Sequence, residues 1–380
     1  MMEDIIKAAS AQFEKLLREQ LARQERMEKG AFTRDFAKAE RIVIGVIGGD
    51  GIGPIIMREA VRALEKLLAD ELASGRVALK EIGGLTLENR LALGQAVPDA
   101  VLAEIKSCDV LLKGPTETPR GGTLESANVT LRRELDLYAN VRPVCVPEEG
   151  IDWIFFRENT EGEYALGSRG IEGPGKLSMD FKVTTDAGTR RIARAAFDYA
   201  RLNGKTRVAI VTKANIMKKT DGMFSRIAHE VAADYPEITA EDWYIDIMSA
   251  NLVNPSVRAG FQVFLLPNLY GDILTDEAAQ IQGGVGTAGS ANIGGECAMF
   301  EAIHGSAPRK IAAGEGDFAN PASILKAAEM LLRHIAMPDR ADRLREAMRL
   351  CIETERRVVV TGHRDGATCQ AFGDYLLEKL

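Results

Sequence analysis

The feature that most constrains the fold is a β-branched run near the start of the main body. Arg41-Ile-Val-Ile-Gly-Val-Ile47 is almost wholly apolar, as strands buried on both faces of a parallel sheet are. A glycine-rich turn, Gly48-Gly-Asp-Gly-Ile-Gly-Pro54, follows it, and apolar residues at helical spacing then extend from Ile55 to Leu68. A strand, a glycine turn and a helix in this order predict an α/β protein.

The glycine turn itself is a weak signal for phosphate binding. It lacks the Lys-Ser/Thr pair of a P-loop, and its glycines do not have the G-x-G-x-x-G spacing of a dinucleotide fingerprint. Pro54 at the start of the helix is an ordinary structural device. We therefore expect a structural turn, and a dinucleotide cradle stays open as the alternative.

The composition is that of an ordinary globular protein. The chain has 380 residues, of which 46% are hydrophobic and 27% charged, enough to bury the core of two domains or of one large α/β unit. A net charge of -7 offers no surface for polyanions, so nucleic acid is not an expected partner. No apolar run reaches the roughly 18 residues of a membrane span, so a membrane is not expected either.

The cysteines are few and scattered. None forms a CxxC or lies at a histidine-rich spacing, which predicts structural thiols rather than a zinc site. This pattern fits a reducing cytosol, so we expect a cytoplasmic protein. The five are Cys108, Cys145, Cys297, Cys351 and Cys369.

Residues 1–40 differ from the rest in composition and predict an amphipathic helical extension. Its apolar positions recur at helical spacing among charged residues and must be buried, either on the body of the same chain or against a second copy. Acidic residues, including Glu3, Asp4, Glu14 and Glu19, disfavour a mitochondrial transit peptide. The apolar positions are Ile5, Ile6, Ala9, Phe13, Leu16, Leu17 and Leu21.

A pair of carboxylates follows the apolar run Phe261-Gln-Val-Phe-Leu-Leu-Pro267, which we interpret as a buried strand. Asp272 and Asp276 are four residues apart, so a helix would project both from one face. Hard oxygen ligands of this kind suit Mg²⁺ or Mn²⁺. The alternative is a solvated first helical turn, where the helix dipole favours aspartate.

The densest group of polar side chains lies between residues 124 and 143. Convergent arginines with hydroxyl and amide donors suit a small di- or tricarboxylate, because each guanidinium matches a carboxylate with two donors. A charged amphipathic helix is the alternative. The group consists of Ser126, Asn128, Arg132, Arg133 and Arg142.

Other polar residues come directly after predicted strands, where α/β sites usually lie. Arg157 and Tyr164 follow the apolar run that begins at Trp153, and Lys213 follows Val208-Ala-Ile-Val211. Burial could lower the pKa of Lys213 and make it a base, and a surface lysine is the alternative. A further short strand, Trp243-Tyr-Ile-Asp246, would end on a possible third metal ligand.

Three irregular or short segments complete the prediction. We expect a Pro- and Gly-rich loop at 115–122, a glycine-rich loop at 283–295 and an irregular stretch from His304. The C-terminal part is predicted to be helical, with a short strand at 357–361.

Taken in order, six of these stretches resemble the decarboxylating β-hydroxyacid dehydrogenases, the family of isocitrate, 3-isopropylmalate and homoisocitrate dehydrogenases. The resemblance extends from about Arg41 to the C-terminus and leaves only residues 1–40 outside. It rests on Gly48-Gly-Asp-Gly-Ile-Gly-Pro54, Leu135-Asp-Leu-Tyr-Ala-Asn-Val-Arg-Pro143, Arg157-Glu-Asn-Thr-Glu-Gly-Glu-Tyr164, Lys213-Ala-Asn-Ile-Met217, Asn268-Leu-Tyr-Gly-Asp-Ile-Leu274 and His304-Gly-Ser-Ala-Pro308.

The resemblance implies an α/β fold unlike the Rossmann unit. A large discontinuous domain would comprise residues 41–138 and 283–380, and a smaller central domain, residues 139–282, would carry the dimer contacts. The chain would therefore form a homodimer or a higher homo-oligomer.

The resemblance also assigns roles to individual residues. Asp272 and Asp276 would bind the metal together with Asp246 of a neighbouring subunit, which would also supply Lys213. Tyr164 would act as general acid beside the substrate, and Arg132, Arg142 and Arg157 would hold its carboxylates. The residues implied to bind the cofactor are Thr116, Asn215, His304, Gly305, Ala307, Arg309, Lys310 and Asn320.

Ser126-Ala-Asn128 favours isocitrate as the substrate, because a hydroxyl and an amide can bind a third carboxylate that an apolar pocket would leave unpaired. The implied reaction, a step of the tricarboxylic acid cycle, oxidises isocitrate at C2 and releases CO₂ to give 2-oxoglutarate. One departure from the family is Glu125, which makes the rim of this pocket more acidic. Homoisocitrate, isopropylmalate or tartrate dehydrogenases, and a noncatalytic regulatory subunit, stay open as alternatives.

The choice of cofactor depends on Arg309 and Lys310. Family members that use NAD tend to place an aspartate just after the His-Gly-x-Ala-Pro motif, whereas two cations could bind the 2′-phosphate of NADP. NADP is therefore favoured. NAD stays open, because the loop from Arg309 to Phe318 is long and the Tyr/Arg pattern of NADP-dependent relatives is not evident at 361–364.

Overall fold

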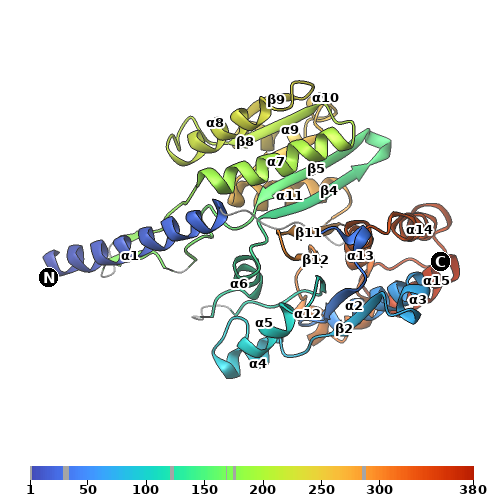
Figure 1. The fold of residues 1–380 in the computed structure, drawn as a ribbon. Helices are drawn as coiled ribbons and strands as arrows, with labels where there is room; N and C mark the ends of the chain where they lie inside the picture. The colour runs from blue at the N-terminus through green and yellow to red at the C-terminus, as the bar shows by residue number, and fades with distance from the viewer. Residues whose placement is uncertain (1, 29–33, 120–123, 168, 174–176, 285–287) are drawn as a thin grey trace. The chain divides into compact units, whose positions relative to one another are not determined.

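The computed structural model describes residues 2–28, 34–119, 124–167, 169–173, 177–284 and 288–380. The chain divides into two compact units. Unit 1 comprises residues 1–32, 138–140 and 145–278, and unit 2 comprises residues 33–137, 141–144 and 279–380. Each unit has its own share of β-strands and covering helices (Figure 1).

Unit 2 is built on five neighbouring strands in the order β2-β1-β3-β12-β11. β1 pairs in parallel with β2 and β3, β3 pairs in parallel with β12, and β12 pairs antiparallel with β11. This confirms the buried parallel strand predicted from the β-branched run. The strands are β1 (Ile42–Ile47), β2 (Val77–Glu81), β3 (Val110–Lys113), β11 (Gly289–Ile293) and β12 (Ala298–Ala302).

Most helices of unit 2 bury apolar residues, and α13 packs directly on three of these strands. The core includes Ile44 and Phe300 of the strands with Leu64 and Leu331 of two helices, all fully or almost fully buried. Pro54 lies in the first turn of α2, as predicted. The helices are α2 (Gly53–Leu67), α3 (Ala69–Ala73), α4 (Leu87–Leu93), α5 (Asp99–Ile105), α6 (Ala127–Glu134), α12 (Pro308–Ala312), α13 (Ala322–His334), α14 (Pro338–Arg349) and α15 (Cys369–Lys379).

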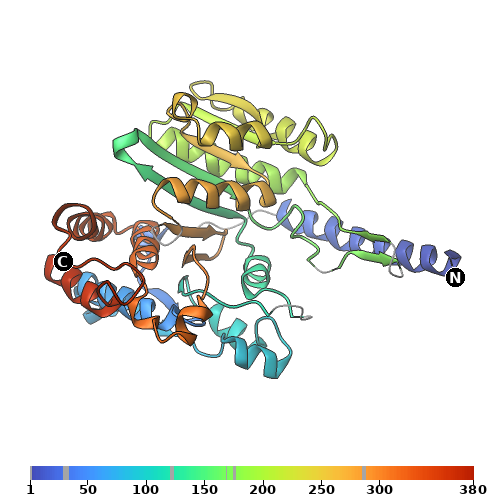
Figure 2. The same cartoon turned by 180° about the vertical axis from the view of Figure 1, so that it is seen from behind.

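Unit 1 contains the parallel strands β5, β10, β8 and β9 in that order. Helix α7 crosses one face of these strands (Figure 1), and α11 crosses the opposite face (Figure 2). The strands are β5 (Ile151–Glu158), β8 (Arg207–Thr212), β9 (Thr239–Tyr244) and β10 (Val263–Leu266), with the small antiparallel pair β6 (Ile171–Gly173) and β7 (Leu177–Met179). The helices are α1 (Met2–Glu28), α7 (Asp186–Leu202), α8 (Thr220–Ala232), α9 (Ile245–Leu252), α10 (Pro255–Arg258) and α11 (Asn268–Ile281).

Strand β4 (Ala139–Val146) has residues in both units. Short turns of other helix types complete the structure. They are the 3₁₀ helices η1 (Phe36–Lys38), η2 (Pro147–Glu149) and η4 (Gly316–Phe318), and the π-helix η5 (Leu350–Glu355). No helix within the described ranges is long and apolar enough to cross a bilayer.

Three predicted segments are wrong. The strand expected to end on Asp246 ends at Tyr244, and Asp246 lies in the first turn of α9. The glycine-rich loop expected at 283–295 contains strand β11, whose small residues pair antiparallel with β12, and its residues 285–287 lie outside the described part of the chain. The strand expected at 357–361 is irregular, because Arg356 turns the chain with a left-handed φ of 50°.

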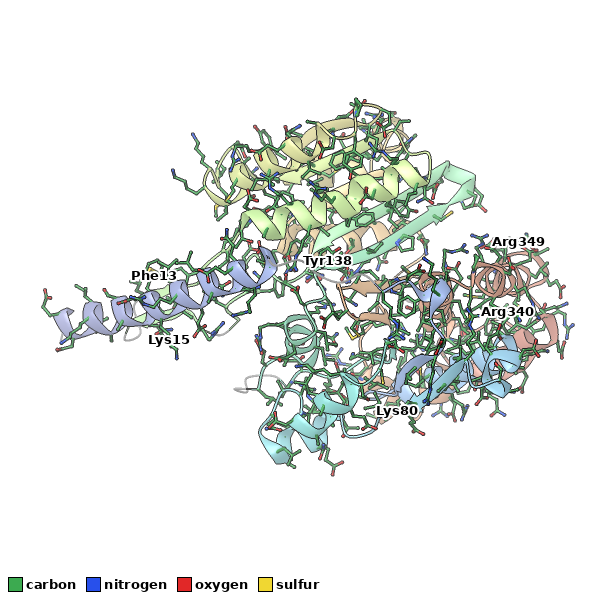
Figure 3. The ribbon with its side chains drawn as sticks, in the orientation of Figure 1. Phe13, Lys15, Lys80, Tyr138, Arg340 and Arg349 are labelled. Atoms are coloured by element: carbon green, nitrogen blue, oxygen red, sulfur yellow. The ribbon has the colours of Figure 1, made fainter. Side chains whose placement is uncertain are left out.

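The N-terminal extension is helical, as predicted, and it packs on its own unit. Leu16 is buried against Ala165 and Leu166, and the ring of Phe13 lies 5.5 Å from that of Phe181. Figure 3 shows Phe13 and Lys15 on different sides of α1. The helix therefore uses one side for docking within the chain. Ile6, Leu17 and Leu21 are exposed, so the burial expected of all the apolar positions is not reached within a single chain.

Candidate active site

The strongest constellation in unit 1 joins the ends of two parallel strands. β5 and β10 pair with Arg157 opposite Leu266, so both strands end at the same edge and α11 starts beside Arg157. The guanidinium donates from Nε and Nη2 to Asn268 Oδ1 at 3.0 and 2.7 Å, and its Nη1 pairs with the Asp272 carboxylate. The Tyr164 hydroxyl donates to Asp272 Oδ2 at 2.9 Å. The structure thus brings Arg157, Tyr164 and Asp272 together.

The close approach of α11 to β5 depends on a glycine. A Cβ atom at Gly271 would lie 2.5 Å from Arg157 Cγ, so a larger residue would push the helix away from the arginine. The Arg157 side chain is only 1% exposed, whereas that of Asp272 is 40% exposed. The cation is therefore buried beneath a carboxylate that faces solvent.

Helix α11 confirms the helical spacing predicted for Asp272 and Asp276. Asp276 is exposed one turn after Asp272, and carboxylate oxygens of this kind fit a hard divalent cation. Within the described residues, no group of three or more acidic, histidine or cysteine side chains is arranged to hold a metal. Asp246 therefore does not join the pair on α11 within one chain.

Asp246 instead contacts the predicted lysine. Lys213, which follows β8, places its Nζ 2.6 Å from Asp246 Oδ1, and this hydrogen bond holds the pKa of the Asp246 carboxyl below its ordinary value. The backbone N–H of Lys213 donates to the buried Asp221 carboxylate at 2.7 Å. Asn215, which was predicted to bind the cofactor, is exposed on the same turn. The two groups expected to serve a neighbouring subunit are thus paired with each other.

Unit 2 carries the other predicted substrate residues on α6. Ser126 precedes the helix, and its hydroxyl makes no capping hydrogen bond. Asn128 accepts a hydrogen bond at 3.2 Å from the hydroxyl of Thr116, a residue predicted to bind the cofactor. Arg142 does not lie on this helix; it is buried in β4.

The acidic rim expected from Glu125 is neutralised. Both Glu125 oxygens accept from Arg133, at 3.0 and 2.8 Å, and the Thr130 hydroxyl donates to the same carboxylate at 2.8 Å. The Arg133 guanidinium is therefore bound to Glu125 at the protein surface.

A buried charged network behind Arg132 was not predicted. The Arg132 Nη2 lies 3.1 Å from Glu301, whose other oxygen lies 3.5 Å from Lys113 Nζ, and Asn292 donates to Glu301 at 2.9 Å. Burial raises the pKa of Glu301, but the Lys113 and Arg132 cations outweigh it and lower the pKa, while burial lowers the pKa of Lys113. The sequence did contain a signal for this network: Lys113 and Glu301 are each the one charged residue in an otherwise apolar strand, β3 and β12.

This network leaves part of Arg132 available. Its Nε is buried and has no hydrogen-bond partner among the described residues. An orphaned guanidinium nitrogen supported by a fixed carboxylate is suited to receive an anion.

The glycine turn at 48–54 is structural, as expected. The Asp50 carboxylate accepts from the N–H groups of Leu87 and Glu117, both at 2.8 Å, and the Ile52 N–H donates to Ser306 O at 3.0 Å. Gly49 and Gly51 have φ of +76° and +58°, and a Cβ on either would lie within about 2.2 Å of a backbone oxygen. The turn therefore holds the neighbouring loops 115–117 and 304–308 in place. The backbone of these loops lies against the glycines, in the space that a phosphate-binding turn would leave open.

The loop from His304 to Lys310 lies beside that turn. His304 Nδ1 contacts Gly305 O at 3.0 Å, its buried Nε2 has no partner in the described part of the chain, and burial lowers its pKa. Ala307 takes a left-handed φ of 49° before α12. An orphaned ring nitrogen beside a sharply turned backbone fits the predicted cofactor loop.

The remaining predicted cofactor residues have different surroundings. Arg309 is exposed, whereas Lys310 Nζ donates to the carbonyl of Gly362. Asn320 accepts from the Ala322 N–H at 2.9 Å, just before α13. Arg309 is therefore the cation with the freer side chain.

The fold and this set of residues define a member of a known family. The family model described as isocitrate/isopropylmalate dehydrogenase matches residues 43–376, so the chain belongs to that family and has its α/β fold. The match begins at residue 43, which leaves α1 outside it.

Individual relatives carry the same family names. The chain is 38% identical to a protein of Caenorhabditis elegans named probable isocitrate dehydrogenase [NAD] subunit alpha, mitochondrial, over 87% of this chain and 89% of that one. It is 38% identical to isocitrate dehydrogenase [NADP] of Thermus thermophilus, over 90% and 68% of the two chains. The crystal structure of isocitrate dehydrogenase from Methylococcus capsulatus matches 89% of this chain and 99% of its own, with a TM-score of 0.79 and 36% identity.

Some relatives are considerably longer. The chain spans 64% of the isocitrate dehydrogenase [NADP] of Rickettsia felis, to which it is 39% identical. Names with NAD and with NADP therefore both occur among proteins of similar identity.

Proposed function

We propose that this chain is an isocitrate dehydrogenase that oxidises isocitrate at C2 and releases CO₂ to form 2-oxoglutarate, reducing NADP or NAD. The observation that carries this proposal is the junction of Tyr164, Arg157 and Asp272 at the ends of two parallel strands. The test is to assay the purified chain with isocitrate, Mg²⁺ and each cofactor. No turnover of isocitrate, or faster turnover of homoisocitrate, isopropylmalate or tartrate, would refute the assignment.

The same assay separates the enzyme from a noncatalytic regulatory subunit. Such a subunit would bind citrate or nucleotide without turnover and would typically lack an aspartate of the metal site, the lysine or the tyrosine. This chain keeps Tyr164, Lys213, Asp246, Asp272 and Asp276, which supports the catalytic alternative.

The metal proposal is that Asp272 and Asp276 of one subunit and Asp246 of a second hold Mg²⁺ or Mn²⁺. Carboxylate oxygens one helical turn apart fit these cations, and the described residues of a single chain bring too few ligands together in one place. When bound, the cation would acidify the substrate hydroxyl and polarise the carbonyl formed from it. A homodimer or higher homo-oligomer follows, and we place it in the cytoplasm on the basis of five free cysteines.

The proton transfers are assigned to two side chains. Lys213 would take the proton from the C2 hydroxyl, and a bound nicotinamide cofactor would supply the acceptor for the hydride. Tyr164 returns a proton to the carbon that has lost CO₂, and its O–H already points at Asp272, 2.9 Å away. The chain therefore has one base and one acid for two separate proton transfers.

The substrate carboxylates are assigned to Arg132, Arg142 and Arg157, and the third carboxylate to Ser126 and Asn128. Two observations support this assignment. The Nε of Arg132 has no hydrogen-bond partner among the described residues, and the Ser126 hydroxyl makes no capping hydrogen bond to its helix. Arg157 is held by Asn268 and Asp272, so its proposed contribution is a fixed positive charge.

Ser126→Ala will lower kcat/KM for isocitrate by about 10- to 100-fold, because a buried carboxylate loses a hydroxyl donor. Steady-state kinetics with isocitrate will measure this loss. The matched control is Ser107→Ala, whose exposed hydroxyl donates to Glu104 O in unit 2. Unchanged kinetics for Ser126→Ala would remove this residue from the substrate site.

Arg309→Asp will shift cofactor preference from NADP toward NAD. A carboxylate would repel the 2′-phosphate that the guanidinium attracts, so the ratio of kcat/KM values for NADP and NAD will fall at least about 10-fold. Arg345→Asp on α14, an exposed arginine paired with Asp342, is the charge-matched control. An unchanged ratio would leave the choice of cofactor to other residues.

A further inference from the structure

The turn that carries Tyr164 is held by a residue outside the family match. Arg23 lies in the C-terminal half of α1, and its side chain is only 16% exposed. Its Nη1 donates to Glu161 Oε1 at 2.9 Å, and its Nη2 donates to the Thr160 hydroxyl at 2.8 Å. The arginine therefore binds two consecutive residues between Arg157 and Tyr164.

Glu161 connects that contact to the candidate active site. Its backbone carbonyl accepts from Asn268 Nδ2 at 2.9 Å, and Asn268 Oδ1 accepts from Arg157. Its carboxylate also accepts the N–H of Thr185, at the start of α7, at 2.9 Å. A continuous set of hydrogen bonds thus joins Arg23 to Arg157 through two buried residues.

Apolar packing keeps α1 in register with this contact. Leu16, two helical turns before Arg23, is 4% exposed and packs on Ala165 and Leu166, which directly follow Tyr164. Gln12 donates to the carbonyls of Arg169 and Gly170 at 3.0 and 2.8 Å. The helix is therefore attached to the segment after Tyr164 as well as to the segment before it.

We propose that Arg23 is a positioning residue for the dehydrogenase reaction: α1 fixes the turn at residues 158–164 and thereby the orientation of Tyr164 and Arg157. This inference rests on the proposed function for its kinetic consequences, whereas the hold on the turn is independent of it. It assigns to the N-terminal helix a role in the site itself.

The charges around the turn explain why a cation is needed there. Glu158 and Glu161 are both buried, and the Glu158 carboxylate accepts from the N–H groups of Thr160 and Glu161 at 3.0 and 2.6 Å. The charged groups that face Glu158 are Glu161 on the turn, Arg191 on α7 and Arg23 on α1. Without Arg23, the buried Glu158 carboxylate would face the like charge of Glu161 with Arg191 as the remaining one of these two cations.

The turn should consequently be sensitive to pH. Burial and the Glu161 charge raise the pKa of Glu158 to about 7, against the lowering effects of Thr160, Arg191 and Arg23. Because the pKa is higher in the ordered turn than in a solvated carboxyl, protonation favours the ordered turn and ionisation loosens it. Loss of Arg23 raises this pKa further, so ionisation costs more and the turn of the variant loosens as the pH rises through neutrality.

Arg23→Met in the full-length chain tests the proposal. We expect kcat near neutral pH to fall about 10-fold with a smaller change in KM, and the fall to be larger above neutral pH than below it, because the ionised Glu158 loosens the turn. Arg18→Met is the matched control, because Arg18 lies on the same helix and, among the described residues, pairs with Glu14 at the surface. Arg23→Lys, which keeps the charge, should restore the activity above neutral pH.

Hydrogen exchange separates this inference from the proposed function. The amides of Thr160 and Glu161 should exchange at least about 10-fold faster in Arg23→Met than in Arg18→Met, whether or not isocitrate is turned over. Unchanged protection would overturn the proposal. An equal fall in kcat at every pH without rescue by Arg23→Lys would also overturn it, because it would indicate only general loosening. If Arg23→Met does not fold, Arg23→Gln, which also removes the charge, takes its place in both measurements, with the same outcomes deciding.

Discussion

Asp272→Asn will reduce metal-dependent oxidation of isocitrate by at least about 10³-fold, because it removes a charged ligand and weakens the contacts of Tyr164 and Arg157 at one point. The amide keeps one oxygen acceptor for the buried guanidinium, so the chain should fold with a free energy of unfolding lower by about 1–3 kcal/mol. Steady-state kinetics, Mn²⁺ titration and denaturant unfolding measure the three effects.

Asp234→Asn is the control for this change. Asp234 is an exposed carboxylate whose side chain is 64% exposed and whose ion-pair distance to Arg194 is 3.8 Å, so its neutralisation should leave all three measurements near wild type. Turnover by Asp272→Asn within tenfold of wild type, or unchanged Mn²⁺ affinity, would contradict the proposed metal site.

Lys213→Met will lower kcat by about 10²- to 10⁴-fold, the usual contribution of a positioned base. The backbone contact of residue 213 with Asp221 does not depend on the side chain, so the turn should keep its shape. Lys218→Met, five residues further along the same surface segment, is the control and should retain activity.

Mixing the two inactive variants tests whether the site is shared. In a dimer of one Asp272→Asn subunit and one Lys213→Met subunit, one of the two sites combines an intact Asp272 with an intact Lys213. Random pairing at equal amounts should then restore about a quarter of wild-type activity. Co-expressed, differently tagged chains allow the mixed dimer to be isolated. A mixed dimer as inactive as its parents would show that each site is built within one chain.

Much of this site was predictable because polar residues at strand ends stand out against apolar runs. The run before Asn268 indicated β10, and the four-residue spacing of Asp272 and Asp276 indicated a helix. The pairing of Arg157 with Asp272 was not predictable, because it depends on which strand lies beside β5. The pairing became visible only with the register of β5 and β10.

The errors have a common physical origin. Strand β11 consists of small and polar residues, which have weak strand preference of their own, and forms because β12 offers a partner. Val358 and Val360 have strong strand preference, yet the segment stays irregular and packs its apolar side chains on the core. In the same way, the charges of Lys113 and Glu301 are tolerable in strands only as a pair that sequence separation conceals.

The turn around Asp50 has a consequence for how this protein could change its cofactor. Its carboxylate and glycines contact the backbone of Leu87 at the start of α4 and of loops 115–117 and 304–308, and backbone atoms are the same whatever side chains those segments carry. The backbone positions of these loops therefore do not depend on which side chains the loops carry. Exposed positions such as Arg309 can be exchanged without rebuilding the scaffold. If Arg309 has its proposed role, the preference for one nicotinamide cofactor can be altered by few substitutions, whereas the glycine-rich motif must stay as it is.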